Sequence, residues 1–227
     1  MLGKNNLKNI RILKSASPSM LIEEYTTGFS LILYVKNKEK DYTCIGTAHF
    51  DHEVTDGERR IAPEKLDGEK AFSISGYSGA YPGFGELLYM LSMMEIQQRG
   101  GRLLPDQRGV SEDAIKLYKK LFFSNNVRTF IKEKLSIYEG SNNPLNATYE
   151  IEINSELKAI AKKLQGNHIA NNLSKDEKTM LLDQAYDLGE NLLEENKIID
   201  RKSLMENLKK GYPQFQIDAD INEEMSF

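Results

Sequence analysis

The sequence predicts an α+β fold, with mixed strands and helices over residues 1–153 and a helical extension over 154–227. Two observations carry this prediction. In the first two thirds, runs rich in β-branched and aromatic residues are bounded by turn residues, which is typical of strands. From Asn154 onward, apolar residues recur at helical spacing instead. A content of 40% hydrophobic and 28% charged residues is that of an ordinary globular protein.

The first predicted elements form a β-hairpin. Two apolar runs, 28–35 and 42–50, flank the polar stretch "KNKEKD". A charged segment over 51–69 with Pro63 follows, and loops of this length often carry function. The next strand is predicted in "KAFSISGYS".

Two helices are predicted after that strand. In "GELLYMLSMMEIQQRG" the apolar residues recur at helical spacing, so this segment is predicted to be an amphipathic helix that ends at Gly100. A short strand, "GRLLP", separates it from a helix that begins at Ser111 as N-cap and ends near Phe123. Further on, "NVRTFIKEKLSIY" fits a helix or a strand, and the alternation in "NATYEIEI" predicts a strand.

The C-terminal region is predicted to hold three helices and an acidic tail. The first begins at Ser155 and ends at Gly166. The second follows the capping-box pair Ser174 and Glu177. The third covers about 201–210, ahead of the tail "DADINEEMSF".

Charge and composition disfavour several classes of partner and location. A formal net charge of -4 provides no broad basic field, which argues against nucleic-acid binding. No apolar run approaches the roughly 20 residues that span a bilayer. The single cysteine, Cys44, cannot form an intrachain disulfide, and the N-terminus lacks a secretory pattern, so we expect a cytoplasmic protein.

The glycine-rich turn "SGAYPGFG" is the first candidate binding site. A strand, a turn and a helix in this order place unpaired backbone N–H groups at a helix N-terminus, where the helix dipole also favours an anion. Gly83 and Gly85 would let a diphosphate approach the backbone. The stretch lacks the Gly-Lys-Ser of nucleotide-triphosphate loops, and Leu88 stands where the dinucleotide fingerprint has glycine. An ordinary turn into a buried helix is the alternative.

Two segments together resemble the GCN5-related N-acetyltransferase (GNAT) family. The turn "AYPGFG" is similar to the family's Gln/Arg-x-x-Gly-x-Gly/Ala turn, with Ala80 at the Gln/Arg position. The segment "SEDAIKLYKKLFF" is similar to Ser/Asn-x-x-Ala-x-x-Leu-Tyr-x-Lys-x-Gly-Phe. The resemblance implies a mixed, mostly antiparallel sheet flanked by helices. It also implies that acetyl-coenzyme A (acetyl-CoA) is bound, with its pyrophosphate on the N–H groups of Gly83, Phe84, Gly85 and Glu86.

The resemblance implies an N-acetyltransferase that transfers acetyl from acetyl-CoA to an unknown amine, with Tyr118 protonating the departing thiolate. A buried role for Tyr118 in the core is the alternative. The phrase "LLPDQRGVSEDA" is similar to divergent bacteriophage-encoded members of the family. A non-catalytic GNAT-fold structural or interaction protein, such as a virion component, is therefore the competing hypothesis, and protein partners would then bind through the C-terminal helices.

Other polar residues provide weaker hypotheses. The stretch "HFDHE" supplies four candidates for a general base: His49, Asp51, His52 and Glu53. Its two histidines lack the spacing of a zinc motif such as His-Glu-x-x-His, so no metal is expected. Ser78 in "GYSGA" only partly matches the Gly-x-Ser-x-Gly turn of hydrolases. His168 is predicted to lie in a loop between helices.

Overall fold

The structure is a computed structural model, and it describes residues 18–36, 42–52, 66–81, 83–106, 110, 112–132, 135 and 143–191. Ser111, Glu53, the predicted helix over 201–210 and the acidic tail lie outside the described residues. None of the described helices combines the length and the apolar character needed to cross a membrane.

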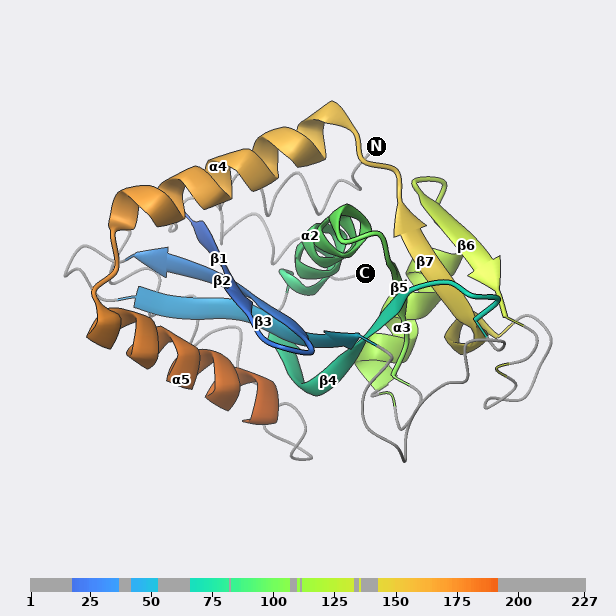
Figure 1. Cartoon of the computed structure of the whole chain (residues 1–227), viewed down its shortest axis with the longest axis horizontal. Coiled ribbons are helices and arrows are strands. Elements are labelled where there is room, and N and C mark those ends of the chain that lie inside the picture. Colours follow the sequence, from blue (N-terminus) through green and yellow to red (C-terminus); the bar gives the residue numbers. More distant parts are fainter. Residues whose placement is uncertain are drawn as a thin grey trace, which may run out of the picture.

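The described strands form one seven-stranded mixed sheet in the order β1-β2-β3-β4-β5-β7-β6 (Figure 1). Every neighbouring pair is antiparallel except β4 and β5, which are parallel. The predicted α+β class with a mostly antiparallel sheet is therefore confirmed. The strands are β1 (Ser19–Glu24), β2 (Gly28–Lys36), β3 (Tyr42–His52), β4 (Ala71–Ala80), β5 (Arg102–Leu104), β6 (Val127–Ile131) and β7 (Ala147–Ile151).

Helices cover both faces of the sheet, because the strands are apolar on both sides. Along β2, Leu31 and Leu33 belong to the core that contains α2 and α4, whereas Ile32 and Tyr34 face α5. This alternation follows from the two-residue period of a strand. The helices are α2 (Gly85–Gln98), α3 (Glu112–Phe122), α4 (Ser155–Asn171) and α5 (Lys175–Asn191), with a 3-10 turn at η2 (Pro144–Asn146).

The helix α2 differs from its predicted amphipathic character, because every residue from Leu87 to Ile96 is buried. The sheet covers one side of α2. Side chains of α3 and α4 belong to the same hydrophobic core as α2. The two polar residues in this stretch have local partners: Ser92 donates to the Leu88 carbonyl at 2.8 Å, and Glu95 pairs with Arg99 at 2.7 Å. These contacts offset the cost of burying polar groups.

The C-terminal helices belong to the same core as the sheet. In α4, Leu157, Ala161 and Leu164 pack with α2, and in α5, Leu181 and Ala185 are fully buried against the opposite face. The Gln184 side chain of α5 bridges two backbone groups of β3: it accepts from the Cys44 N–H at 3.1 Å and donates to the Tyr42 carbonyl at 3.0 Å. The predicted extension thus completes one structure with the sheet.

Three local predictions need correction. The helix α4 continues past Gly166 and ends at Asn171, where Asn172 takes the left-handed conformation with φ 46°. His168 therefore lies in this helix rather than in a loop, with its Nδ1 2.8 Å from the Tyr34 hydroxyl. The strand β1 was not predicted, and the ambiguous segment after α3 forms β6.

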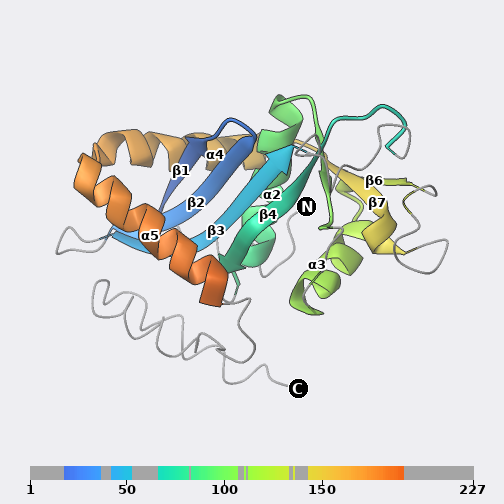
Figure 2. The ribbon, with the colours of Figure 1, turned by 60° about the horizontal axis from the view of Figure 1, so that its bottom comes forward.

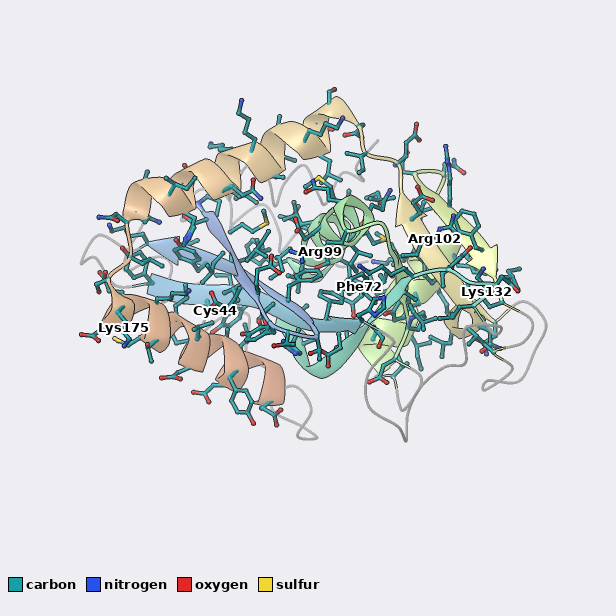
Figure 3. All side chains as sticks on the ribbon, in the orientation of Figure 1. Cys44, Phe72, Arg99, Arg102, Lys132 and Lys175 are labelled. Atoms are coloured by element: carbon teal, nitrogen blue, oxygen red, sulfur yellow. The ribbon has the colours of Figure 1, made fainter. Side chains whose placement is uncertain are left out.

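A cluster of charges joins the β4–β5 end of the sheet to β6 and β7. Lys132, only 5% exposed, has its Nζ 2.9 Å from Glu69 and 3.3 Å from Asp67. Arg102 pairs with Glu69 and lies over the Phe130 ring at 3.5 Å. Figure 3 shows Arg102 and Lys132 on this side of the molecule, far from Cys44 beside α5. Glu150 of β7 also pairs with Arg102 at 3.5 Å, so the ion pairs of this cluster connect the segment before β4 with β5 and β7.

Candidate functional site

The candidate site begins where the two parallel strands separate. β4 and β5 pair from Ala71 and Arg102 to Ser73 and Leu104. β4 then continues to Ala80, and no described residue of β5 accompanies it. In sheets with parallel strands, ligands bind beyond the carboxyl ends of the strands, where the neighbouring connections diverge. The second half of β4 is therefore a place where a ligand could pair with strand backbone.

A β-bulge in β4 lies directly after this separation. Ala48 of β3 pairs with Ser78 and Phe50 pairs with Ile74, so two steps along β3 match four steps along β4. Bulges leave backbone groups unpaired and are frequent beside active sites. The bulge thus lies at the point where β4 loses its β5 neighbour.

The predicted anion site lies at the end of β4, at the N-terminus of α2. Gly83 has φ 92°, a conformation that other residues rarely adopt, and a side chain at Gly85 would enter open space. The Phe84 N–H already donates to the Tyr81 carbonyl at 3.0 Å, and the Phe84 side chain is buried. Glu86 lies in the first turn of α2. The dipole of α2 would favour an anion at this end of the helix, whereas the Glu86 carboxylate opposes one.

Tyr118, the predicted acid, is in the core with an exposed fraction of 1%. Its ring contacts those of Tyr89 and Tyr149, with centroids 5.9 and 5.7 Å away. Its hydroxyl makes no hydrogen bond of ordinary geometry with any described residue. Leaving a buried hydroxyl without a partner costs about 1–3 kcal/mol. A buried polar group in this state calls for an explanation, and a catalytic role is one of those that apply in proteins.

The electrostatic surroundings keep this hydroxyl protonated. Burial raises the pKa of Tyr118 well above 10, and the nearby Tyr89, Tyr149 and Asp106 raise it further. Burial likewise raises the pKa of Tyr89 to about 12, although its contacts with Tyr118 and Ser78 act in the opposite direction. Near neutral pH both groups are therefore phenols that can donate a proton in a hydrogen bond.

The described residues of "HFDHE", 49–52, do not converge on one point. Phe50 lies in the core with α2, so His49 and Asp51, its neighbours along β3, point to the opposite face of the sheet. His52 stacks edge-on against Phe72 on the α2 face, with centroids 5.3 Å apart. Among the described residues no group of three or more His, Cys, Asp or Glu side chains could hold a metal ion.

The hydrolase interpretation of Ser78 is wrong. Ser78 lies within strand β4 and pairs with Ala48, so it is not at a strand-to-helix turn. His168, the histidine that follows it in the chain, contacts Tyr34 near the β1 edge of the sheet. The two side chains therefore lack the geometry of a nucleophile and its base.

Sequence reasoning missed three parts of this site: the bulge, Tyr89 and Asp106. A glycine within a strand pattern often marks a bulge, and Gly76 in "AFSISGYS" is such a signal. Tyr89 and Asp106 carried no comparable signal, because their relation to Tyr118 arises only when α2, β5 and α3 pack together.

Comparison of the chain with protein-family models, with curated proteins and with solved structures found no match.

Proposed function

We propose that this protein is an N-acetyltransferase of the GNAT type, which transfers acetyl from acetyl-CoA to an amine. The observation that carries the proposal is the buried hydroxyl of Tyr118, which makes no hydrogen bond of ordinary geometry with a described residue and whose ring contacts Tyr149 of β7, the strand next to β5. The bulge at 75–77 and the glycine turn at 83–85 lie along the same strand and its continuation. An extended cofactor could follow this line, with its thioester at the bulge and its pyrophosphate at the turn.

The proposed reaction is direct attack of the amine nitrogen on the thioester carbonyl. A carbon–nitrogen bond forms, the carbon–sulfur bond breaks, and the electron pair of that bond goes to sulfur. Backbone N–H groups in the second half of β4 would stabilise the negative charge that develops on the carbonyl oxygen. Tyr118 then transfers its proton to the departing thiolate. The high pKa of Tyr118 makes it a weak acid, but it also ensures that the proton is present.

The competing proposal is a non-catalytic GNAT-fold protein with a structural or interaction role, such as a virion component. Ala80, where the family turn has Gln or Arg, and the Phe84 N–H, which is bonded to Tyr81, favour it. A protein partner would contact the exposed apolar side chains of the C-terminal helices: Ile169, Met180 and Tyr186.

Calorimetric titration with acetyl-CoA separates these proposals. We expect saturable binding to the wild-type chain and a Kd raised about tenfold or more, or ~1.4 kcal/mol, in Gly85→Glu. The new carboxylate would repel the pyrophosphate. Because a Cβ atom at Gly85 meets no atom within 4 Å, we expect neither Gly85→Glu nor the control Gly85→Ala to disturb the fold.

The control variant Gly85→Ala separates the effect of the added charge from the effect of adding any side chain. Gly85→Ala should bind acetyl-CoA nearly as well as the wild type, since a methyl group adds no charge. No saturable binding to the wild type at millimolar acetyl-CoA would refute the enzyme proposal and favour the non-catalytic one. Equal binding by Gly85→Glu would show that the pyrophosphate lies elsewhere.

A further inference from the structure

The strand β6 forms one edge of the sheet, and no described helix or strand lies beyond it (Figure 1). In Figure 2, β6 lies at the end of the sheet remote from α5. The opposite edge strand, β1, is flanked by α4, whose Asn167 and Asn171 side chains donate to the Pro18 carbonyl at 2.7 Å and to the Ser19 hydroxyl at 3.0 Å. An uncovered edge strand presents unpaired backbone groups to which another strand can bind.

The hydrogen bonds between β6 and β7 determine which backbone groups of β6 point outward. Just beyond the strand, the Lys132 N–H donates to the Asn146 carbonyl at 2.8 Å, and the register of the two strands is unbroken from there. In an antiparallel ladder, residues that bond to the neighbouring strand alternate with residues whose N–H and C=O groups face the other way. Arg128 and Phe130 therefore bond to β7. The odd-numbered residues, with Thr129 at the centre, direct their backbone groups away from the sheet.

The edge of β6 lacks features that commonly prevent strand pairing. Its sequence, "VRTFI", contains no proline and a single charge, and its pairing with β7 has no bulge. Large apolar side chains are exposed at both ends of the strand: Phe123, just before it, is 79% exposed, and Ile131 is 41% exposed. Apolar side chains that are exposed beside an uncovered edge favour a protein as the occupant.

The sequence of β6 is self-complementary, which favours a second copy of this chain as that protein. If two β6 strands pair antiparallel with Thr129 on a twofold axis, Val127 of each copy lies opposite Ile131 of the other. In the same register Arg128 lies opposite Phe130. The first pair is apolar, and the second allows a guanidinium to stack on an aromatic ring. Like charges, which would oppose pairing, do not lie directly opposite each other.

This register also covers the exposed apolar side chains. Thr129 lies opposite Tyr149, whose ring packs against α3, so the odd-numbered residues of β6 face α3. Ile131 of one copy, next to Val127 of the other, therefore lies on the α3 side of the joined sheet. That position is beside the turn that connects α3 to β6, and Phe123 lies in this turn.

We propose that two copies of this chain pair through β6 around a twofold axis at Thr129 and so join their sheets into one. The inference does not depend on the proposed acetyl transfer. The two Thr129 residues exchange N–H···O=C bonds, and the Ile131 N–H of each copy donates to the Val127 carbonyl of the other. The Val127 N–H keeps its bond to the Ser124 carbonyl at 3.2 Å. One pair of strands is a small interface, so we expect a reversible dimer with a Kd on the order of 10 μM.

Sedimentation velocity of the full-length chain across the micromolar range tests the dimer. We expect the mass to rise from that of one chain to that of two. Thr129→Pro removes the N–H on the axis and should raise the Kd about tenfold or more, and proline is tolerated where the N–H faces away from the sheet. Thr129→Ala, the matched control, keeps the N–H and should dimerise like the wild type. Ile131→Lys, at an exposed position, should also weaken the dimer.

Cysteine cross-linking tests the register. Two Thr129→Cys residues on the axis would have Cα atoms about 5.5 Å apart, which a disulfide can join. Two Arg128→Cys residues would lie diagonally, about 7–8 Å apart, which is too far. Mild oxidation should therefore link Thr129→Cys chains and leave Arg128→Cys chains single. The native Cys44 is buried and does not interfere.

Each measurement can overturn the proposal. A mass of one chain at every concentration would exclude the dimer and leave the edge to a strand of another protein. Dimerisation of Thr129→Pro and Ile131→Lys equal to that of the wild type would place the interface elsewhere. Equal cross-linking of Arg128→Cys and Thr129→Cys would contradict the register. Near-UV circular dichroism checks each fold, and if Thr129→Pro is unfolded, Ile131→Lys and the cysteine pair decide.

Discussion

Tyr118 and Tyr149 are neighbours in the core and differ in the hydrogen bonding of their hydroxyl groups. The Tyr149 hydroxyl donates to the Pro144 carbonyl, whereas the Tyr118 hydroxyl makes no hydrogen bond of ordinary geometry with a described residue. We expect Tyr118→Phe to raise the free energy of unfolding of the free protein, by up to about 1–3 kcal/mol, since it removes a buried unsatisfied group. Tyr149→Phe should lower it by about 0.5–1.5 kcal/mol. Urea denaturation measures both.

The same pair distinguishes function from packing. If Tyr118 is the acid, Tyr118→Phe should lower kcat for acetyl transfer more than it weakens acetyl-CoA binding, because the hydroxyl is needed mainly in the transition state. A stabilised protein with reduced turnover would support a functional hydroxyl. Destabilisation by Tyr118→Phe would instead mean that the hydroxyl has a structural partner.

At the residue scale, the backbone requirements of the turn were easier to predict than its hydrogen bonds. Gly83 indeed has a positive φ, because a tight turn between a strand and a helix needs one. The bond from Phe84 N–H to the Tyr81 carbonyl depends on the turn's actual path, which composition does not specify. The sequence does not indicate that the Tyr118 hydroxyl lacks a hydrogen bond of ordinary geometry, because this state depends on the packing of α2, α3 and β7.

At the scale of elements, the start of α5 was predicted correctly from a local pattern. The Ser174 N–H donates to Glu177 at 2.8 Å, and the Glu177 N–H donates to the Ser174 hydroxyl at 3.2 Å. Ser174→Ala should therefore lower the free energy of unfolding by ~1 kcal/mol. Thr179→Ala is the control: its exposed hydroxyl only donates to the Lys175 carbonyl within the helix, and alanine has the higher helix propensity. Thermal unfolding should show a lower Tm for Ser174→Ala alone, and equal values would contradict the cap.

Elements whose form depends on distant partners were predicted less well. The hairpin of β2 and β3 follows from apolar alternation and a polar turn, which are local signals. β1 is a short segment of six residues that becomes a strand by pairing along β2. The burial of α2 on all sides is foreshadowed in the sequence, because Ser92 and Glu95 are the two polar residues between Leu87 and Ile96. The cause of this burial is the packing of α3 and α4 in the same core as α2 and the sheet.

At the scale of the whole molecule, composition separated residues 1–153 from 154–227, but packing unites them. Sequence patterns report where helices begin and end, and they do not report which surface a helix will cover. The face of the sheet that carries Leu21, Ile32, Tyr34 and Cys44 is apolar and is covered by α5. Burial beneath this helix raises the pKa of the Cys44 thiol to about 12, which leaves it unreactive.

Adjacent residues of α5 test whether the helix belongs to the cooperative unit of the sheet. Leu181 is fully buried, whereas Met180 is 60% exposed. Leu181→Asp would place an unpaired carboxylate against the sheet and should lower the free energy of unfolding by about 2–5 kcal/mol, the range of large core substitutions. Met180→Asp should change it by less than about 0.5 kcal/mol, as exposed substitutions do. Urea unfolding monitored by near-UV circular dichroism measures this effect. If the structure is one unit, Leu181→Asp should shift a single transition to lower urea concentration. If the C-terminal helices folded independently, Leu181→Asp would leave the unfolding transition of the sheet unchanged.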